Sequence, residues 1–145
     1  VIDEDGWFHT GDIGEIDKDG YIKITGRIKN MIVLGGGKKI FPEEVEAVLE
    51  KSSYFKEVCV LGHVKTFGSK DGTEEVTAVI VPSDDILSQY SDEEIDKLIK
   101  GEVKQLAMKL TSYKRPVNVV VHKEALPRTA TNKVKRKEVK KLVTV

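Results

Sequence analysis

Residues 57–64 have the sequence EVCVLGHV, and residues 75–81 have the sequence EVTAVIV. Apolar and β-branched side chains dominate both stretches, which is typical of buried strands. A polar, glycine-containing stretch over residues 67–73 separates them, and Pro82 ends the second. These stretches therefore predict a β-hairpin with a long loop, and the rest of the chain is interpreted around it.

Helices are predicted on both sides of this hairpin. Upstream, residues 41–44 (FPEE) open a helix with proline at its first position and acids in its first turn. Downstream, residues 91–94 (SDEE) form a capping box. The apolar residues that follow these two starts at helical spacing are Val45, Val48 and Leu49, and then Ile95, Leu98, Ile99, Val103, Leu106, Ala107 and Leu110.

Two further strands and one helix complete this part of the chain. Residues 31–34 predict a short buried strand, residues 117–121 a third sheet strand after Pro116, and residues 135–142 a short helix. From Lys29 onward the order is β-α-β-β-α-β-loop-α. That order predicts a small α+β domain with helices packed on a sheet of about three strands.

Residues 1–28 predict β-hairpins of a different kind. Residues 14–17 and 21–25 alternate apolar and polar side chains around a turn at residues 17–20 (DKDG). Two strands alone are marginal in water, so we expect them to belong to a larger sheet. The chain also starts at Val1 without methionine. We therefore expect a piece of a longer protein, with one domain ending at residue 28 and another over residues 29–145.

Composition limits the possible functions. The chain has 145 residues, of which 24 are Lys or Arg and 24 are Asp or Glu, and zero net charge disfavours a dedicated nucleic-acid binder. No apolar run approaches the ~20 residues of a membrane span, and no signal-peptide pattern is present. The single cysteine, Cys59, excludes an internal disulfide and fits a reducing cytoplasm. The three histidines (His9, His63 and His122) show no metal-ligand spacing.

Several short motifs have both a functional and a structural interpretation. Asp12, next to Gly11, has the two acceptor oxygens that a ribose diol needs, but for this short motif alone a solvated turn aspartate is the more common explanation. Arg27 and Lys29 are either phosphate or ribose contacts or a charged linker. The triple glycine Gly35, Gly36 and Gly37 lets a ligand approach the backbone or forms a surface turn.

The most informative lysine follows a loop of turn-forming residues. Residues 126–136 have the sequence LPRTATNKVKR, in which Pro127 fixes φ and Thr129, Thr131 and Asn132 favour turns. Lys133 is thereby presented at a defined place, where it could stabilise charge on a phosphoryl or acyl group. The alternative is a solvated basic tail, because residues 128–141 contain seven Lys or Arg residues. Such a tail could meet RNA or an acidic carrier protein.

In combination, five motifs resemble those of the adenylate-forming superfamily, which includes acyl-CoA synthetases, luciferases and the adenylation domains of peptide synthetases. The motifs are residues 6–12 (GWFHTGD), 19–21 (DGY), 26–30 (GRIKN), 35–46 (GGGKKIFPEEVE) and 127–133 (PRTATNK). Their order covers the end of a large N-terminal domain and a complete small C-terminal domain. The run from Gly11 to the triple glycine looks most like the long-chain fatty-acyl branch.

The resemblance implies a role for each matching residue. Asp12 and Arg27 would contact the ribose of ATP and AMP, and Lys29 would be the hinge about which the small domain turns. Gly35, Gly36 and Gly37 would line the pantetheine path of CoA. Lys133 would be the catalytic lysine of acyl-AMP formation. Asn132 stands where the family usually has glycine; because asparagine tolerates the left-handed region, we expect the loop shape to survive. Asn30 replaces a frequent aspartate.

The implied protein is a cytoplasmic, AMP-forming long-chain fatty-acid–CoA ligase that acts on fatty acid, ATP and CoA. Its partner would be its own N-terminal domain, which would carry the Mg²⁺ ligands, the phosphate loop and the acyl pocket. We expect neither a nucleic-acid partner nor a transmembrane segment. Peripheral association with a membrane is compatible with these expectations. The fragment alone should be inactive. The alternatives are a ligase that loads a carrier protein and, from another class, an RNA-binding α+β module.

Overall fold

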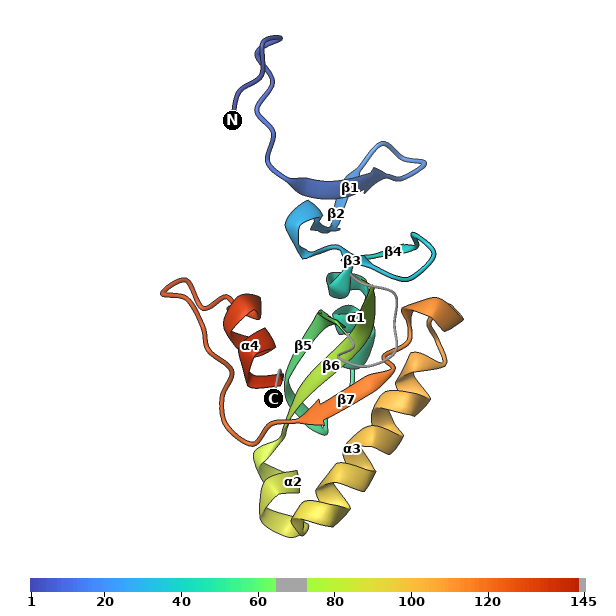
Figure 1. Ribbon diagram of the computed structural model, residues 1–145, viewed down its shortest axis with the longest axis vertical. Coiled ribbons are helices and arrows are strands. Elements are labelled where there is room, and N and C mark those ends of the chain that lie inside the picture. The colour runs from blue at the N-terminus through green and yellow to red at the C-terminus, as the bar shows by residue number, and fades with distance from the viewer. Residues whose placement is uncertain (65–72, 144–145) are drawn as a thin grey trace.

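A three-stranded sheet forms the centre of the computed structural model, which describes residues 1–64 and 73–143 (Figure 1). Strand β5 (Phe55–Val64) pairs antiparallel with β6 (Glu74–Pro82), and β6 pairs in parallel with β7 (Asn118–Val121). The predicted hairpin and third strand are confirmed, although Pro82 lies within β6 instead of following it. The loop predicted at residues 67–73 lies, apart from Thr73, outside the described residues.

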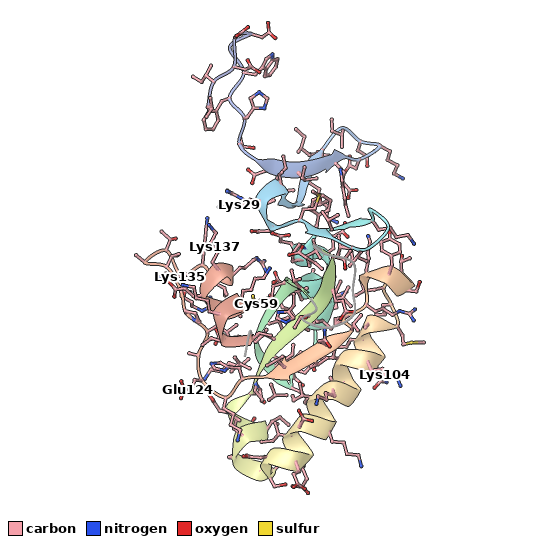
Figure 2. All side chains as sticks on the ribbon, in the orientation of Figure 1. Lys29, Cys59, Lys104, Glu124, Lys135 and Lys137 are labelled. Atoms are coloured by element: carbon pink, nitrogen blue, oxygen red, sulfur yellow. The ribbon has the colours of Figure 1, made fainter. Side chains whose placement is uncertain are left out.

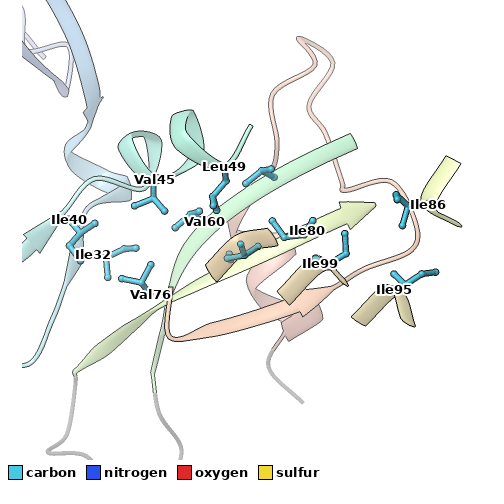
Figure 3. Close-up of a cluster of buried hydrophobic side chains, with 13 residues drawn as sticks. Ile32, Ile40, Val45, Leu49, Val60, Val76, Ile80, Ile86, Ile95 and Ile99 are labelled. Atoms are coloured by element: carbon cyan, nitrogen blue, oxygen red, sulfur yellow. The ribbon is translucent and has the colours of Figure 1, made fainter. Parts of the chain in front are cut away.

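Helices cover both faces of this sheet because side chains alternate along the strands. On one face, α1 (Pro42–Leu49) and α3 (Asp92–Ala107) pack against β5 and β6 and build the larger core (Figures 1 and 3). Its central members are Val45, Leu49, Val60, Val76, Ile80, Ile95 and Ile99. On the other face, α4 (Arg136–Val143) packs through Val139 onto a smaller core that contains Cys59, Val79 and Leu126. The result is the expected α+β architecture.

The starts of α1 and α3 follow from their sequences. Pro42 occupies the first position of α1, and Glu43 and Glu44 lie in its first turn. Carboxylates there interact favourably with the positive end of the helix dipole. At the start of α3, Ser91 and Glu94 form the predicted capping box. Buried residues then recur at Ile95, Ile99 and Val103, so the helical stripe is confirmed as the face toward the core.

Some elements were not expected from the sequence. Helix α2 (Asp84–Gln89) follows β6, and a 3-10 turn, η2 (Ser112–Lys114), precedes β7. The short strand β3 (Ile32–Val33) is where predicted, but it pairs with β4 (Lys39–Ile40), which was not predicted. The prediction of a short buried strand there was wrong in part. Ile32 is buried, whereas Val33 is exposed because it faces away from the core.

The N-terminal part stands apart from the central sheet (Figure 1). Ile2 and Phe8 form one bridge, and β1 (Asp12–Ile16) pairs antiparallel with β2 (Ile22–Arg27), as the sequence predicts. A 3-10 turn, η1 (Ile28–Asn30), connects β2 to β3. No helix of the described ranges, 1–64 and 73–143, has the length and apolar character needed to cross a membrane.

Candidate functional site

A cleft of ≈ 1190 Å³ lies between the segment around η1, strand β5 and the chain leading into α4. Three of the predicted site residues line it: Arg27, Lys29 and Lys133. They come from opposite ends of the chain, so the fold brings them to one place. Figure 2 shows Lys29 and Lys137 projecting on the same side of the molecule, from η1 and from α4.

Asp12 is held beside this cleft by Arg27. The two residues face each other in the register of β1 and β2, and Arg27 Nε lies 2.8 Å from Asp12 Oδ1. The Asp12 side chain is 27% exposed, so one carboxylate oxygen is engaged by the guanidinium while the group still reaches the surface. The pair presents a fixed acceptor next to a fixed cation, which suits a hydroxyl-rich ligand.

Lys29 lies in the middle of η1, and its neighbour is tied to α1. Asn30 Nδ2 donates to Glu43 Oε1 at 2.7 Å, and an added Cβ at Gly26 would lie only 3.0 Å from Phe41 Cβ. These contacts join the β1–β2 hairpin to the helical part of the chain. An aspartate at position 30 would instead oppose the Glu43 carboxylate, so the amide found there has a local explanation.

Lys133 stands at the end of a small hairpin that begins at Arg128. Thr129 N donates to Lys133 O at 2.8 Å, Asn132 N donates to Thr129 O at 2.9 Å, and Lys133 N donates to Thr129 Oγ1 at 3.1 Å. Asn132 has φ 63°, in the left-handed region. The predicted turn chemistry of Thr129 and Asn132 is confirmed, and asparagine does take the conformation that glycine would favour.

The cleft is lined by cations that have carboxylate partners and by cations that have none among the described residues. Arg128 is paired with Glu57, Arg136 with Glu46, and Lys140 with Glu74. Within residues 1–64 and 73–143, Lys29, Lys133 and Lys137 have no carboxylate partner. Three ammonium groups are therefore free to meet an anionic ligand in this cleft.

Sequence reasoning missed Arg136, which is the most heavily engaged cation at the site. Arg136 Nη2 lies 2.8 Å from Glu46 Oε2, Nη1 contacts Glu46 Oε1, and Nη1 also donates to Val60 O at 2.7 Å. Burial disfavours the charged form of Arg136, but its hydrogen bonds and charge interaction with Glu46 outweigh burial and raise the pKa above its ordinary value. The group stays charged and fastens α4 to α1 and β5. In sequence it is one of several basic residues, with no local signal to distinguish it.

Cys59 is not a reactive thiol in this arrangement. Its side chain is buried in the smaller core, and burial raises the pKa of Cys59 to about 11, against a weaker opposing effect of Arg136. A thiol with such a pKa carries little thiolate at neutral pH. The interpretation of Cys59 as a core residue is thus supported.

The triple glycine does not share the cleft with Lys133. Gly35, Gly36 and Gly37 form the turn between β3 and β4, with positive φ at Gly36 and Gly37, and the turn is exposed. In Figure 1 this turn and the segment leading into α4 lie on opposite sides of the molecule. The neighbouring Lys38 Nζ lies 4.6 Å from the centre of the Tyr113 ring, which braces the turn against η2.

A metal site does not emerge from the side chains that the structure describes. Within residues 1–64 and 73–143, no group of three or more His, Cys, Asp or Glu residues is arranged to hold a metal ion. These residues do not fit Mg²⁺, so no step is assigned to that ion here. The expectation that its ligands lie in another domain stays a prediction.

Comparison with known proteins gives this geometry a family. The family model described as AMP-binding enzyme C-terminal domain matches residues 29–143. An indoleacetate–CoA ligase of Aromatoleum aromaticum is 40% identical over 141 residues, which cover 97% of this chain and 24% of that protein. A long-chain-fatty-acid–CoA ligase of Mycobacterium tuberculosis is 36% identical over 131 residues, covering 90% and 23%. The chain thus spans about a quarter of the length of these relatives.

A solved structure supports the same assignment. The o-succinylbenzoate CoA synthetase of Bacillus subtilis, in complex with an acyl-adenylate intermediate, aligns with a TM-score of 0.74 and 29% identity over 96% of this chain. The fold and the matches define a C-terminal domain of the adenylate-forming CoA ligase superfamily. More particularly, the chain belongs to the AMP-binding enzyme C-terminal domain family. That membership favours the ligase interpretation over an RNA-binding module.

Proposed function

We propose that this chain is the mobile C-terminal part of a longer, AMP-forming acid–thiol ligase that makes acyl-CoA from a carboxylic acid, ATP and CoA. The observation that carries the proposal is the meeting of Arg27, Lys29 and Lys133 in one cleft, with Asp12 fixed on Arg27. Residues 1–28 would be the edge of the preceding domain. Residues 29–145 would be the small domain that turns on Lys29.

In the first half-reaction, a carboxylate oxygen of the acid attacks the α-phosphorus of ATP. The bond to the β-phosphate oxygen breaks, pyrophosphate leaves, and acyl-AMP forms. Lys133 would place its ammonium beside the oxygens that gain negative charge, where a fixed cation stabilises the transition state more than the substrate. Asp12 would accept hydrogen bonds from the ribose hydroxyls, and Arg27 would hold that carboxylate in place.

In the second half-reaction, the thiolate of CoA attacks the acyl carbonyl carbon and AMP leaves. Lys133 has no part in this step in our proposal, because the small domain turns about Lys29 and presents another face. The exposed turn at Gly35, Gly36 and Gly37 would then line the path of the pantetheine arm. The separation of that turn from the Lys133 hairpin supports the idea of two faces for two steps (Figure 1).

For the acid, we propose a long-chain fatty acid. The M. tuberculosis relative supports this choice, with 36% identity over 90% of the chain. The A. aromaticum relative supports an arylacetic acid instead. A screen of pyrophosphate release by the longer protein, across fatty acids of increasing length and arylacetic acids, separates the two. We also propose a cytoplasmic location, for which the free Cys59 thiol is the support.

For the acceptor, CoA is the first choice because the relatives are CoA ligases. A carrier protein is the second, and the unpaired Lys133 and Lys137 favour it because an acidic partner would meet both. Supplying preformed acyl-AMP with either CoA or an acidic carrier protein tests the choice. Thioester on the carrier alone would replace the first proposal by the second.

The test of Lys133 is the Lys133→Ala substitution in the longer polypeptide, with the two half-reactions measured separately. We expect acyl-AMP formation to fall by at least about 100-fold, the scale of losing one transition-state charge contact. Thioester formation from supplied acyl-AMP should change less than about twofold, because Lys133 has left the site by then.

Lys104 provides the control for this experiment. It is an exposed lysine of α3 that does not line the cleft, and it has no carboxylate partner among the described residues. Lys104→Ala should leave both half-reactions near the unmodified rates. If Lys133→Ala slows both steps equally, or if Lys104→Ala reproduces its effect, the assigned role of Lys133 is wrong.

A further inference from the structure

The hairpin that carries Lys133 has almost no packing of its own. Residues 128–133 are all exposed, and the nearest buried residue before them is Leu126. The hydrogen bonds within the hairpin fix its shape but not its direction relative to the sheet. Leu126 before the hairpin and Val134 after it pack in or against the smaller core, so the hairpin is anchored at its two ends. A further contact is needed to hold the exposed residues between them, since loop segments without buried side chains are mobile by default.

Arg128 makes that contact with all three of its nitrogens. Arg128 Nε donates to Glu57 Oε1 at 2.8 Å, and Nη2 contacts the same oxygen. On its other edge, Arg128 Nη1 donates to the carbonyl oxygen of Asn132 at 2.9 Å. That carbonyl belongs to the peptide bond that joins Asn132 to Lys133. The guanidinium therefore ties the backbone at Lys133 to a carboxylate on β5.

Glu57 is suited to serve as the fixed end of this link. Its side chain is only 8% exposed, against 35% for Arg128. Its second oxygen accepts a hydrogen bond from Leu126 N at 3.0 Å, and Leu126 is anchored in the smaller core. A carboxylate held by a rigid strand and by a core-anchored backbone group has little freedom. The planar Arg128 guanidinium, which contacts both Glu57 and the hairpin backbone, therefore holds the hairpin in a fixed place relative to this carboxylate.

We propose that Arg128 is a positioning residue for acyl-AMP formation, which acts by holding the backbone of Lys133 against Glu57. The inference rests on the proposed role of Lys133. Since Arg128 acts through Lys133 in this account, it matters only in the first half-reaction and only when the lysine is present. An ordinary structural ion pair would instead affect stability and both half-reactions alike.

The experiment compares Arg128→Gln in the longer polypeptide with the same substitution in a Lys133→Ala background. In the first case we expect the kcat of acyl-AMP formation to fall by about 10- to 100-fold, the scale of a misplacement of about 1 Å. The KM for ATP and the rate of thioester formation from supplied acyl-AMP should change less than about twofold. In the Lys133→Ala background, single-turnover acyl-AMP formation should show no further loss.

Two other variants keep the test decisive. Arg128→Lys retains a charge for Glu57 but cannot reach Asn132 O at the same time, so it should show a partial loss of kcat while the protein stays folded. It carries the test if Arg128→Gln fails to fold. Arg115→Gln is the control, because Arg115 Nε also donates to a backbone carbonyl, Leu110 O at 3.0 Å, away from the cleft. It should leave both half-reactions unchanged.

The outcomes distinguish this inference from the function on which it rests. If Lys133→Ala leaves acyl-AMP formation intact, the role of Lys133 and the inference both fail. If Lys133→Ala abolishes that step while Arg128→Gln does not slow it, only the inference fails. Equal losses in both half-reactions, or a further loss in the Lys133→Ala background, would also overturn it, because Arg128 would then act independently of Lys133.

Discussion

Asn132 shows how one backbone conformation decides where a side chain stands. Its φ of 63° reverses the chain just before Lys133. The left-handed region disfavours residues with a Cβ, and asparagine is among the few that adopt it readily. Its carbonyl, in turn, accepts the bond from Arg128. The residue before the lysine thus sets both the turn of the hairpin and the point at which the hairpin is fastened.

Substitution of Asn132 should therefore separate conformation from side-chain chemistry. Asn132→Gly should keep the unfolding free energy within about 1 kcal/mol and preserve acyl-AMP formation, because glycine adopts positive φ without strain. Asn132→Val should lose about 1–2 kcal/mol, since a β-branched residue is strained there, and should slow acyl-AMP formation. Urea unfolding and a pyrophosphate-release assay measure the two effects. A Val variant with unchanged rate would show that the hairpin shape does not control Lys133.

At the scale of single elements, the positions of helices were easier to predict from the sequence than the pairing of strands. Helices α1 and α3 were predictable because their signals are local: α1 begins with a proline, α3 begins with a capping box, and apolar residues recur at helical spacing in both. Helix α2 was missed because its six residues bury only Ile86, which leaves no periodic pattern. The parallel pairing of β6 with β7 was also out of reach, since the sequence does not state which strand edge a later segment joins.

The same limit applies to the candidate site. The turn at Thr129 and Asn132 was predictable because its hydrogen bonds are local. Two other contacts, of Arg128 with Glu57 and of Arg136 with Glu46, join residues that are far apart in sequence. In the sequence alone, nothing distinguishes these four residues from ordinary charged residues on a protein surface. The resemblance to adenylate-forming enzymes pointed to Lys133, but only the fold revealed what holds it.

The element that joins the N-terminal hairpin to the helical part is η1. Apart from covalent connection, its described side-chain hydrogen bond is the one from Asn30 Nδ2 to Glu43 Oε1, at 2.7 Å. Glu43 Oε2 is buried without a partner in the described ranges. Among the described residues, the link thus consists of one side-chain hydrogen bond beside the proposed hinge, Lys29, and the close packing of Gly26 against Phe41. One such bond is weak enough to break during a domain rotation and strong enough to define a resting position.

Exchanging the two ends of this contact should test it. In Asn30→Asp, two carboxylates would face each other, so backbone amides near η1, including Met31 N, which donates to Ile28 O, should exchange hydrogen faster at pH 7. Adding Glu43→Gln places an amide opposite the new carboxylate and should restore slow exchange. Hydrogen exchange followed by mass spectrometry measures both variants. If the double variant exchanges as fast as Asn30→Asp, the contact does not hold η1.

At the scale of the whole molecule, buried and exposed apolar side chains lie in different parts of the chain. Every buried hydrophobic side chain of the described ranges belongs to residue 32 or a later one. Within residues 1–28 only Gly26 is buried, whereas Trp7 and Tyr21 are each 73% exposed, and Phe8, Ile16, Ile22 and Ile24 are also exposed. So many exposed apolar side chains in one part of a protein are typical of a surface that contacts another domain or protein. We propose that it faces the domain that precedes residue 29.

Removal of residues 1–28 should therefore leave the stability of the remainder nearly unchanged. We expect residues 29–145 to unfold in urea with a free energy within about 1 kcal/mol of that of the 145-residue chain, because no hydrophobic side chain of the core is lost. The shorter chain should also bind less of a hydrophobic dye and stay monomeric in sedimentation at concentrations where the longer one associates. A replacement of Trp7 and Phe8 by serine in the longer chain should reproduce the change in association without truncation. A loss of several kcal/mol on truncation would instead place the N-terminal hairpins inside the same cooperative unit, and the proposed boundary at residue 29 would be wrong.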